Sequence, residues 1–123
     1  MTAQPKPILS GTAVVIAADE AMRASLTFLL QTCGLAVTEV EGPEQLERNG
    51  GSPPDHIFMD CELVEESGGA ILSALRQRGW TGSAILMAED EQACARAAYL
   101  FDNCIVLTKP FSSEDVLAAI GGD

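Results

Sequence analysis

Short apolar runs alternate along the chain with amphipathic stretches that place apolar side chains every three or four positions. The apolar runs are mostly continuous, which is typical of strands buried on both faces of a sheet; they cover residues 13–17, 35–40, 56–59, 83–88 and 104–107. The amphipathic stretches predict one helix that begins after the N-cap Asp19 and stops at Gly34, and four more over residues 42–46, 68–78, 89–99 and 112–120.

Strands and helices in strict alternation predict an α/β protein with a doubly wound, five-stranded parallel sheet and five helices on its two faces. Residues 1–10 are polar and rich in proline, so we expect a leader or linker there and one domain over residues 11–123. Ligands of such sheets bind outside the carboxyl ends of the strands. The loops after the strands are therefore where functional residues are expected.

Composition and charge exclude several classes of protein. The 123 residues include 7 Lys and Arg against 18 Asp and Glu, which gives a formal net charge of −11. Such a chain has few cations to replace phosphate counterions, so nucleic acid and anionic membrane surfaces are not expected partners. No apolar run approaches the ~20 residues of a membrane span. The spacing of the four cysteines fits no metal site, and we expect reduced thiols in a cytoplasmic protein; they are Cys33, Cys61, Cys94 and Cys104.

Acidic side chains gather in the loops that follow the strands. Nine of the 18 carboxylates lie in three such loops, and one lysine follows the fifth strand; the acids are Asp19, Glu20, Asp60, Glu62, Glu65, Glu66, Glu89, Asp90 and Glu91. This chemistry suits a hard divalent cation or a single reactive carboxylate beside an ammonium group, and does not suit a phosphate cradle. The acids that open helices also complement the helix dipole. Asp60 differs because it ends an apolar strand and needs a partner, for which Lys109 is the candidate.

Three other side chains have simpler interpretations. His56 begins a strand beside Asp55, and we expect a surface residue rather than a catalytic base. Trp80 lies in a Gly-rich turn and is interpreted as a packed loop anchor. Cys61 follows Asp60, and the surrounding acids would keep its thiol unreactive.

Two motifs resemble those of response-regulator receiver domains. Residues 60–72, Asp-Cys-Glu-Leu-Val-Glu-Glu-Ser-Gly-Gly-Ala-Ile-Leu, are similar to the phosphoacceptor loop of that family, an Asp followed by a turn and a Gly before the third helix. Residues 108–111, Thr-Lys-Pro-Phe, are similar to its Lys-Pro motif. The resemblance implies a flavodoxin-like fold with strand order 2-1-3-4-5. It also implies that Asp60 is the phosphoacceptor position and that Lys109 contacts the phosphoryl group.

Four positions depart from the family pattern. The Arg23-Ala-Ser-Leu26 segment fixes the register of the first loop, and the acidic pair of the family then falls on Ala17 and Ala18. The hydroxyl expected after the fourth strand falls on Ala88, and the aromatic switch residue of the fifth falls on Val106. Magnesium would then be held weakly, with only Asp60, Glu62 and the displaced Asp19 and Glu20 as possible ligands.

The sequence therefore favours a degenerate receiver that is not an enzyme. It would bind or regulate protein partners (a histidine kinase, a hybrid-kinase domain or a downstream regulator) with little or no phosphotransfer. The alternative is a working receiver, phosphorylated on Asp60 by a histidine kinase, that uses Asp19 or Glu20 as substitute magnesium ligands. A third possibility, a flavin carrier of flavodoxin-like fold, is disfavoured because the acidic first loop would repel a flavin phosphate.

Overall fold

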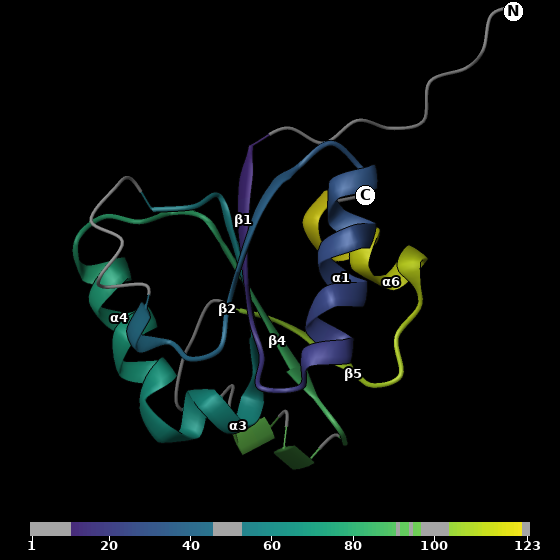
Figure 1. Ribbon diagram of the computed structural model, residues 1–123. Helices are drawn as coiled ribbons and strands as arrows, with labels where there is room; N and C mark the ends of the chain where they lie inside the picture. The colour runs from purple at the N-terminus through teal and green to yellow at the C-terminus, as the bar shows by residue number, and fades with distance from the viewer. Residues whose placement is uncertain (1–10, 46–52, 91, 94, 97–103, 122–123) are drawn as a thin grey trace, which may run out of the picture.

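A five-stranded parallel sheet forms the centre of the molecule (Figure 1). The computed structural model describes residues 11–45, 53–90, 92–93, 95–96 and 104–121. The strands are β1 (Thr12–Ile16), β2 (Ala36–Val40), β3 (His56–Asp60), β4 (Ser83–Ala88) and β5 (Ile105–Thr108). Their order in the sheet is β2-β1-β3-β4-β5, which confirms the predicted topology.

The three central strands are buried because both faces of the sheet are covered. In β3 successive side chains alternate between two apolar clusters, so that Ile57 and Met59 pack on one face and Phe58 packs on the other. The edge strand β5 is less buried, and its Ile105 is exposed. This burial explains why the central strands have continuous apolar sequences rather than alternating ones.

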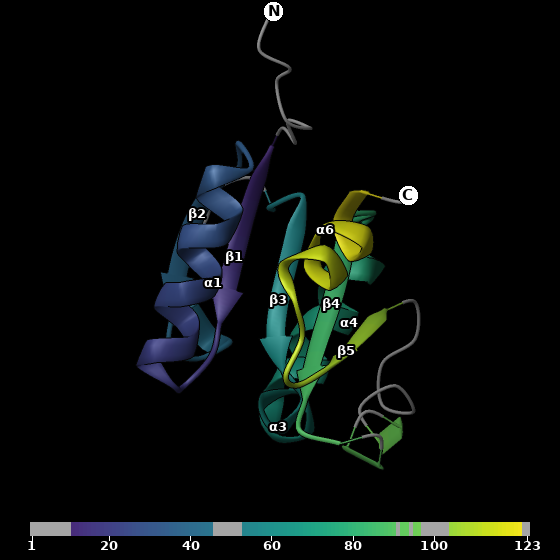
Figure 2. The same ribbon diagram turned by 90° about the vertical axis from the view of Figure 1, so that its right-hand side faces the viewer.

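Helices lie on both faces of the sheet (Figure 2). Helices α1 (Glu20–Thr32) and α6 (Ser113–Gly121) share one face, where Leu30 and Val116 are fully buried in the same apolar cluster. Helix α4 (Gly69–Gln77) covers the other face through Leu72. No helix within the described ranges is long and apolar enough to cross a membrane.

The helical segment after β3 begins earlier than predicted. Instead of a turn followed by a helix from residue 68, the chain enters helix α3 (Cys61–Leu63) directly, continues through a π-helical turn, η1 (Val64–Gly68), and runs into α4. The side chains of Cys61 and Val64, three residues apart, are both buried, which favours helix over turn. The expected turn after Asp60 was therefore wrong.

Two predicted helices fall partly outside the described residues. Helical residues occur at 44–45 within the predicted 42–46 segment, and at 92–93 and 95–96 within the predicted 89–99 segment. The proposed leader, residues 1–10, also lies outside the described part of the chain. The other predicted strands and helices agree with the structure to within two residues at each end.

Candidate functional site

Asp60 is the last residue of β3 and lies at the carboxyl edge of the sheet. It is paired in register with Met87 of β4, and only 7% of its surface is exposed. Asp60 also occupies the N-cap position of α3, yet its side chain makes no capping hydrogen bond. A buried carboxylate that does not cap a helix needs another partner, because desolvation of its charge is otherwise costly.

That partner is Lys109, which follows β5. Its backbone N–H donates to the carbonyl of Ala88 at 2.6 Å and extends the pairing of β4 with β5 by one residue. The Lys109 Nζ lies 2.9 Å from Asp60 Oδ1 and 3.9 Å from Oε2 of the exposed Glu89. Because β4 separates β3 from β5, the pair needs the full reach of a lysine side chain. The structure therefore brings together the two residues that the sequence singled out.

Opposing effects act on the Lys109 ammonium. Burial on its own would lower its pKa, but the nearby carboxylates of Asp60, Glu89 and Glu62 outweigh this effect and hold the pKa above its ordinary value. Lys109 is therefore protonated at neutral pH and neutralises the buried charge of Asp60.

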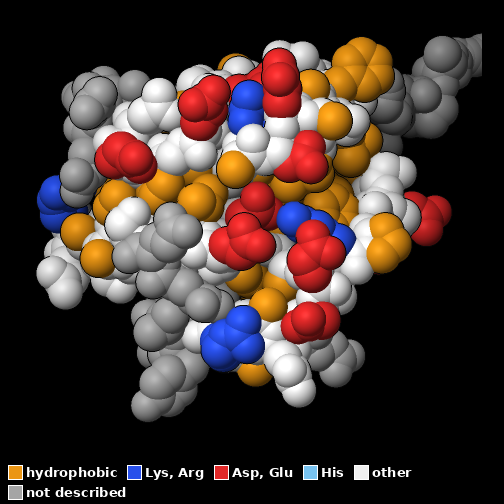
Figure 3. All heavy atoms as spheres, turned by 60° about the horizontal axis from the view of Figure 1, so that its bottom comes forward, with side chains coloured by type: hydrophobic (Ala, Val, Ile, Leu, Met, Phe, Trp, Pro, Cys, Tyr) orange, Lys and Arg blue, Asp and Glu red, His pale blue; other side chains and the backbone are white. Residues whose placement is uncertain are grey.

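A pocket of about 580 Å³ opens beside this ion pair; its lining residues are Asp60, Cys61, Glu62, Met87, Ala88, Glu89, Asp90, Ala93, Arg96 and Lys109. Figure 3 looks onto this edge of the sheet, where acidic side chains gather around a few basic ones. The side chains of Glu65 and Glu66, which the sequence also placed in this loop, lie outside the description. Asp19 and Glu20 do not line the pocket.

The first loop is held by a buried arginine rather than by acidic side chains. Arg23 Nη1 donates to the backbone carbonyl of Ala17 at 2.6 Å, and its Nε lies 3.2 Å from Oε1 of Glu39 on β2. Ala17 is fully buried. Asp19 caps α1, as predicted, because its Oδ1 accepts a hydrogen bond from the N–H of Met22 at 3.0 Å. Among the described residues, no three His, Cys, Asp or Glu side chains are grouped to hold a metal ion.

Close packing fixes the segment that follows Asp60. A Cβ placed on Gly68 would overlap the Sδ of Met59 and would lie 2.9 Å from the carbonyl oxygen of Leu63. A larger residue at this position would require Met59 or the π-helical turn to shift. Because Met59 precedes Asp60, this contact helps to fix the end of β3.

The two positions where the sequence resemblance predicts switch residues carry small apolar side chains. Ala88 ends β4 and is 3% exposed, and Val106 lies half-buried in β5. Neither side chain has a hydrogen-bonding group. Ala88 lines the Asp60 pocket but has no hydroxyl to offer a ligand there.

Trp80 agrees with its interpretation as a packed loop anchor, and His56 differs from its expected position on the surface. Trp80 is 8% exposed, and its Nε1 donates to the Pro54 carbonyl at 2.6 Å, at the amino edge of the sheet. Cys61 is buried. His56 was expected on the surface but is half-buried, and its Nδ1 has no hydrogen-bond partner. Burial lowers the pKa of His56 despite the nearby Asp55 carboxylate.

In the sequence, Arg23 served only to set the register of the first loop, and its hydrogen bond to the loop backbone was not predicted. Its main partner is a backbone carbonyl, which no sequence pattern identifies. One signal was present, because Arg23 lies three residues before the buried Leu26 and four before Thr27, on the face of α1 that meets the sheet.

Comparisons with known proteins agree with the observed fold. A family model described as the response regulator receiver domain matches residues 13–121. The transcriptional regulatory protein FixJ of Azorhizobium caulinodans is 33% identical over an alignment of 109 residues, and the match covers 86% of this chain and 51% of FixJ. The chain thus spans about half the length of that relative.

Solved structures with the same fold include full-length FixJ and a response regulator receiver protein. Full-length FixJ from B. japonicum has a TM-score of 0.72 at 25% identity, and the match covers 91% of this chain and 56% of FixJ. A response regulator receiver protein from Pseudoalteromonas atlantica has a TM-score of 0.73 at 21% identity, and the match covers 90% of this chain and 94% of that protein. The second likeness concerns the fold alone.

Proposed function

Because the chain belongs to the response-regulator receiver family of two-component signalling proteins, we propose that it works as a protein-binding module with little or no phosphotransfer. The observation that carries this proposal is the composition of the site. Asp60 and Lys109 form their ion pair, whereas the first loop presents Ala17 and Ala18, with Arg23 bonded to its backbone. By family resemblance, Asp60 has the phosphoacceptor position and Lys109 the phosphoryl-contacting one.

Charge balance supports the absence of phosphotransfer. Receiver chemistry relies on a divalent cation to neutralise charge during transfer, and carboxylates of the first loop would hold that cation. Here Lys109 already compensates Asp60, so the pocket has a weaker demand for a cation. A phosphorylated Asp60 would carry about two negative charges opposite a single ammonium. Magnesium, if bound, would have to use Asp60 with Glu62 or with the displaced Asp19 and Glu20.

The residues at the switch positions support a partner surface that does not respond to Asp60. A ligand shifts an equilibrium between two conformations only by its differential affinity for them. Ala88 offers no hydrogen bond to a phosphoryl group, and Val106 has no large ring to move between two packings. We therefore infer that partners, such as a histidine kinase, a hybrid-kinase domain or a downstream regulator, bind irrespective of phosphorylation. The cysteine spacing supports a cytoplasmic location.

Magnesium titration followed by the amide resonances of the protein tests this proposal. Trp80 is a poor reporter, because it lies at the amino edge of the sheet and Asp60 at the carboxyl edge. At about 10 mM magnesium we expect no saturable shift at the amides of Asp60 and Lys109, since the typical carboxylate ligands are missing. The Ala17→Asp, Ala18→Asp double variant should bind magnesium, and the Ala17→Asn, Ala18→Asn double variant is its uncharged control.

Saturable binding by the unsubstituted protein at millimolar magnesium would overturn the proposal. It would favour the working receiver, and loss of that binding in Asp19→Asn or Glu20→Gln would identify the substitute ligand. Asp19 Oδ1 already accepts the N-cap hydrogen bond of α1, so its use as a magnesium ligand would cost the helix this bond.

A further inference from the structure

Strand β2 forms one edge of the sheet and pairs on one side only, with β1 (Figure 2). The whole of β2 is paired with β1 in an unbroken parallel register. The Ala36 N–H donates to the carbonyl of Gly11 at 3.1 Å, so the backbone of Ala36 faces β1. Because successive residues of a strand direct their backbone groups alternately to its two sides, the N–H and C=O groups of Val37 and Glu39 point away from β1.

These outward groups of β2 are open to a partner. Within the described ranges, no backbone or side-chain group bonds the N–H or the carbonyl of Val37 or of Glu39. The open edge ends two residues later, because the N–H of Glu41 donates to Gln45 Oε1 at 2.9 Å. The edge therefore offers the backbone donors and acceptors of Val37 and Glu39, at the spacing that a further strand requires.

The sequence of β2 lacks the features with which proteins usually block an edge strand. Its residues, Ala-Val-Thr-Glu-Val, include no proline and no lysine, and its register with β1 contains no bulge. Its one charged side chain, that of Glu39, is held by Arg23 of α1, with 3.2 Å between Arg23 Nε and Glu39 Oε1. A further strand can therefore pair with this edge without breaking a bond that the structure already makes.

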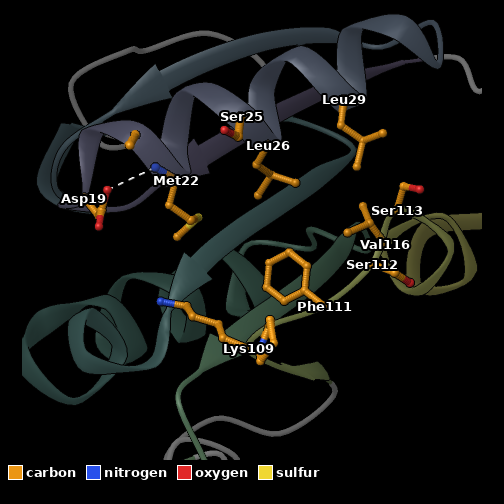
Figure 4. A pocket seen from close by; sticks show the side chains of 12 residues that line it. Asp19, Met22, Ser25, Leu26, Leu29, Lys109, Phe111, Ser112, Ser113 and Val116 are labelled. Atoms are coloured by element: carbon orange, nitrogen blue, oxygen red, sulfur yellow. Dashed lines mark hydrogen bonds between the residues drawn. The ribbon is translucent and has the colours of Figure 1, made fainter.

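Helix α1 covers one face of β2 but uses its other side for a different contact. Arg23 reaches Glu39 on β2, whereas Met22 and Leu29 point towards Phe111 across an apolar groove between α1 and α6 (Figure 4). Arg23 is not part of the lining of that groove. The open edge of β2 is therefore a surface separate from the groove.

The charged groups at this edge are acidic. The side chains of Glu39, Glu41 and Glu44 are all exposed. Arg23, the basic side chain that contacts β2, is only 10% exposed and donates to the Ala17 carbonyl. A basic segment would therefore be attracted to this edge. A second copy of the chain would instead bring a second set of carboxylates to it, and the net charge of −11 also opposes self-association.

We propose that the open edge of β2 binds an extended, basic segment of a partner protein, which adds a further strand to the sheet. The inference rests on the proposed function as a protein-binding module and names the chemistry of a partner segment. Backbone hydrogen bonds to Val37 and Glu39 supply the affinity. Lysine or arginine beside the acidic side chains supplies the selectivity.

The test uses three designed peptides of about nine residues, the length of a long strand. The first alternates threonine with lysine, and the second alternates threonine with glutamate. The third has the sequence of the first but is methylated on every backbone nitrogen, so that it keeps its charge and donates no backbone hydrogen bond. Binding to the full chain is followed by amide shifts, and hydrogen exchange is measured for each amide of β2.

We expect the lysine peptide to slow hydrogen exchange at the amides of Val37 and Glu39 by at least about tenfold. The amides of Ala36 and Thr38, which face β1, should change by less than about twofold. The glutamate peptide and the methylated peptide should each bind at least about tenfold more weakly than the lysine peptide. The alternation along β2 distinguishes strand addition from attraction between opposite net charges.

Two substitutions of Glu39 separate the contribution of the backbone from that of the charge. Glu39→Gln keeps the outward N–H and should weaken the lysine peptide by about two- to threefold. Glu39→Pro removes the N–H as well and should weaken it by at least about tenfold; proline is tolerated on an edge strand where the N–H faces solvent. The methylated peptide tests the same hydrogen bonds in the unsubstituted chain, so the result does not depend on the folding of Glu39→Pro.

Three results would overturn the inference: no binding of the lysine peptide, equal binding of the methylated peptide, or protection that is the same at Thr38 as at Val37 and Glu39. A dimer in sedimentation that Glu39→Pro dissociates would also overturn it and assign the edge to a second copy. None of these results bears on magnesium binding at Asp60, so failure here is distinguishable from failure of the proposed function.

Discussion

The carboxylate of Asp60 is the more buried partner of its ion pair with Lys109, since 10% of the Asp60 side chain is exposed against 24% of the Lys109 side chain. The two charges lie 2.9 Å apart, but only the lysine can turn to solvent or to Glu89 if the pair is broken. The consequences of removing either partner are therefore unequal.

Lys109→Met should destabilise the protein by about 3 kcal/mol, because it leaves the buried Asp60 charge without compensation. Asp60→Asn should cost about 1 kcal/mol or less, because the Lys109 ammonium can then reach water. Urea unfolding of both variants measures the difference. In the double variant the cost should be smaller than the sum of the two, and strict additivity would show that the pair is not coupled.

Gly68→Ala should lower the free energy of unfolding by about 1–3 kcal/mol, because the new Cβ overlaps Met59 and crowds the Leu63 carbonyl. The matched control is Ser67→Ala, an exposed position in the same π-helical turn, which should change stability by less than about 0.5 kcal/mol. Thermal unfolding of the two variants measures this difference in stability. Equal stability would mean that the turn can move away from β3 without cost.

The third pair of variants compares the two contacts of Arg23, with the first loop and with Glu39. Arg23→Met should cost about 1–2 kcal/mol, because it deprives the buried Ala17 carbonyl of its donor. Glu39→Gln should cost less than about 0.5 kcal/mol, since 39% of the Glu39 side chain is exposed and such ion pairs contribute little. Chemical denaturation of the pair measures the ranking, and a larger loss for Glu39→Gln would reverse our assignment of the main contact.

Stability should also depend on the protonation of His56. Burial lowers its pKa below the ordinary value of 6.5, so the unfolded chain takes up a proton at a higher pH than the folded protein does. The stability linked to His56 is complete above pH 6.5 and decreases as the pH falls from there towards the folded pKa. The slope cannot exceed about 1.4 kcal/mol per pH unit for one proton. Unfolding curves between pH 5.5 and about 7.5 should show this decrease in the natural chain, and His56→Gln should flatten it. An unchanged slope in that variant would assign the dependence to other groups.

The fold could be predicted because continuous apolar runs such as residues 83–88 identify buried parallel strands, and right-handed crossovers restrict their arrangement. The Asp60–Lys109 pair could be predicted because a strand-ending acid needs compensation and parallel strands end at one edge. The early start of the helical segment at Cys61 could not be predicted, because the apolar pattern of this segment lasts barely one turn. The hydrogen bond from Arg23 to Ala17 could not either, because its acceptor is a backbone group common to every residue.

Phosphoryl labelling of Asp60 tests the central claim most directly. Three proteins are incubated with acetyl phosphate, with and without magnesium, and the mass gain is followed with time: the unsubstituted chain, the Ala17→Asp, Ala18→Asp variant, and that variant with Asp60→Asn added. We predict negligible labelling of the unsubstituted chain whether or not magnesium is present, and magnesium-dependent labelling of the double aspartate variant that Asp60→Asn in the same background abolishes. Rapid magnesium-dependent labelling of Asp60 in the unsubstituted chain would contradict the account.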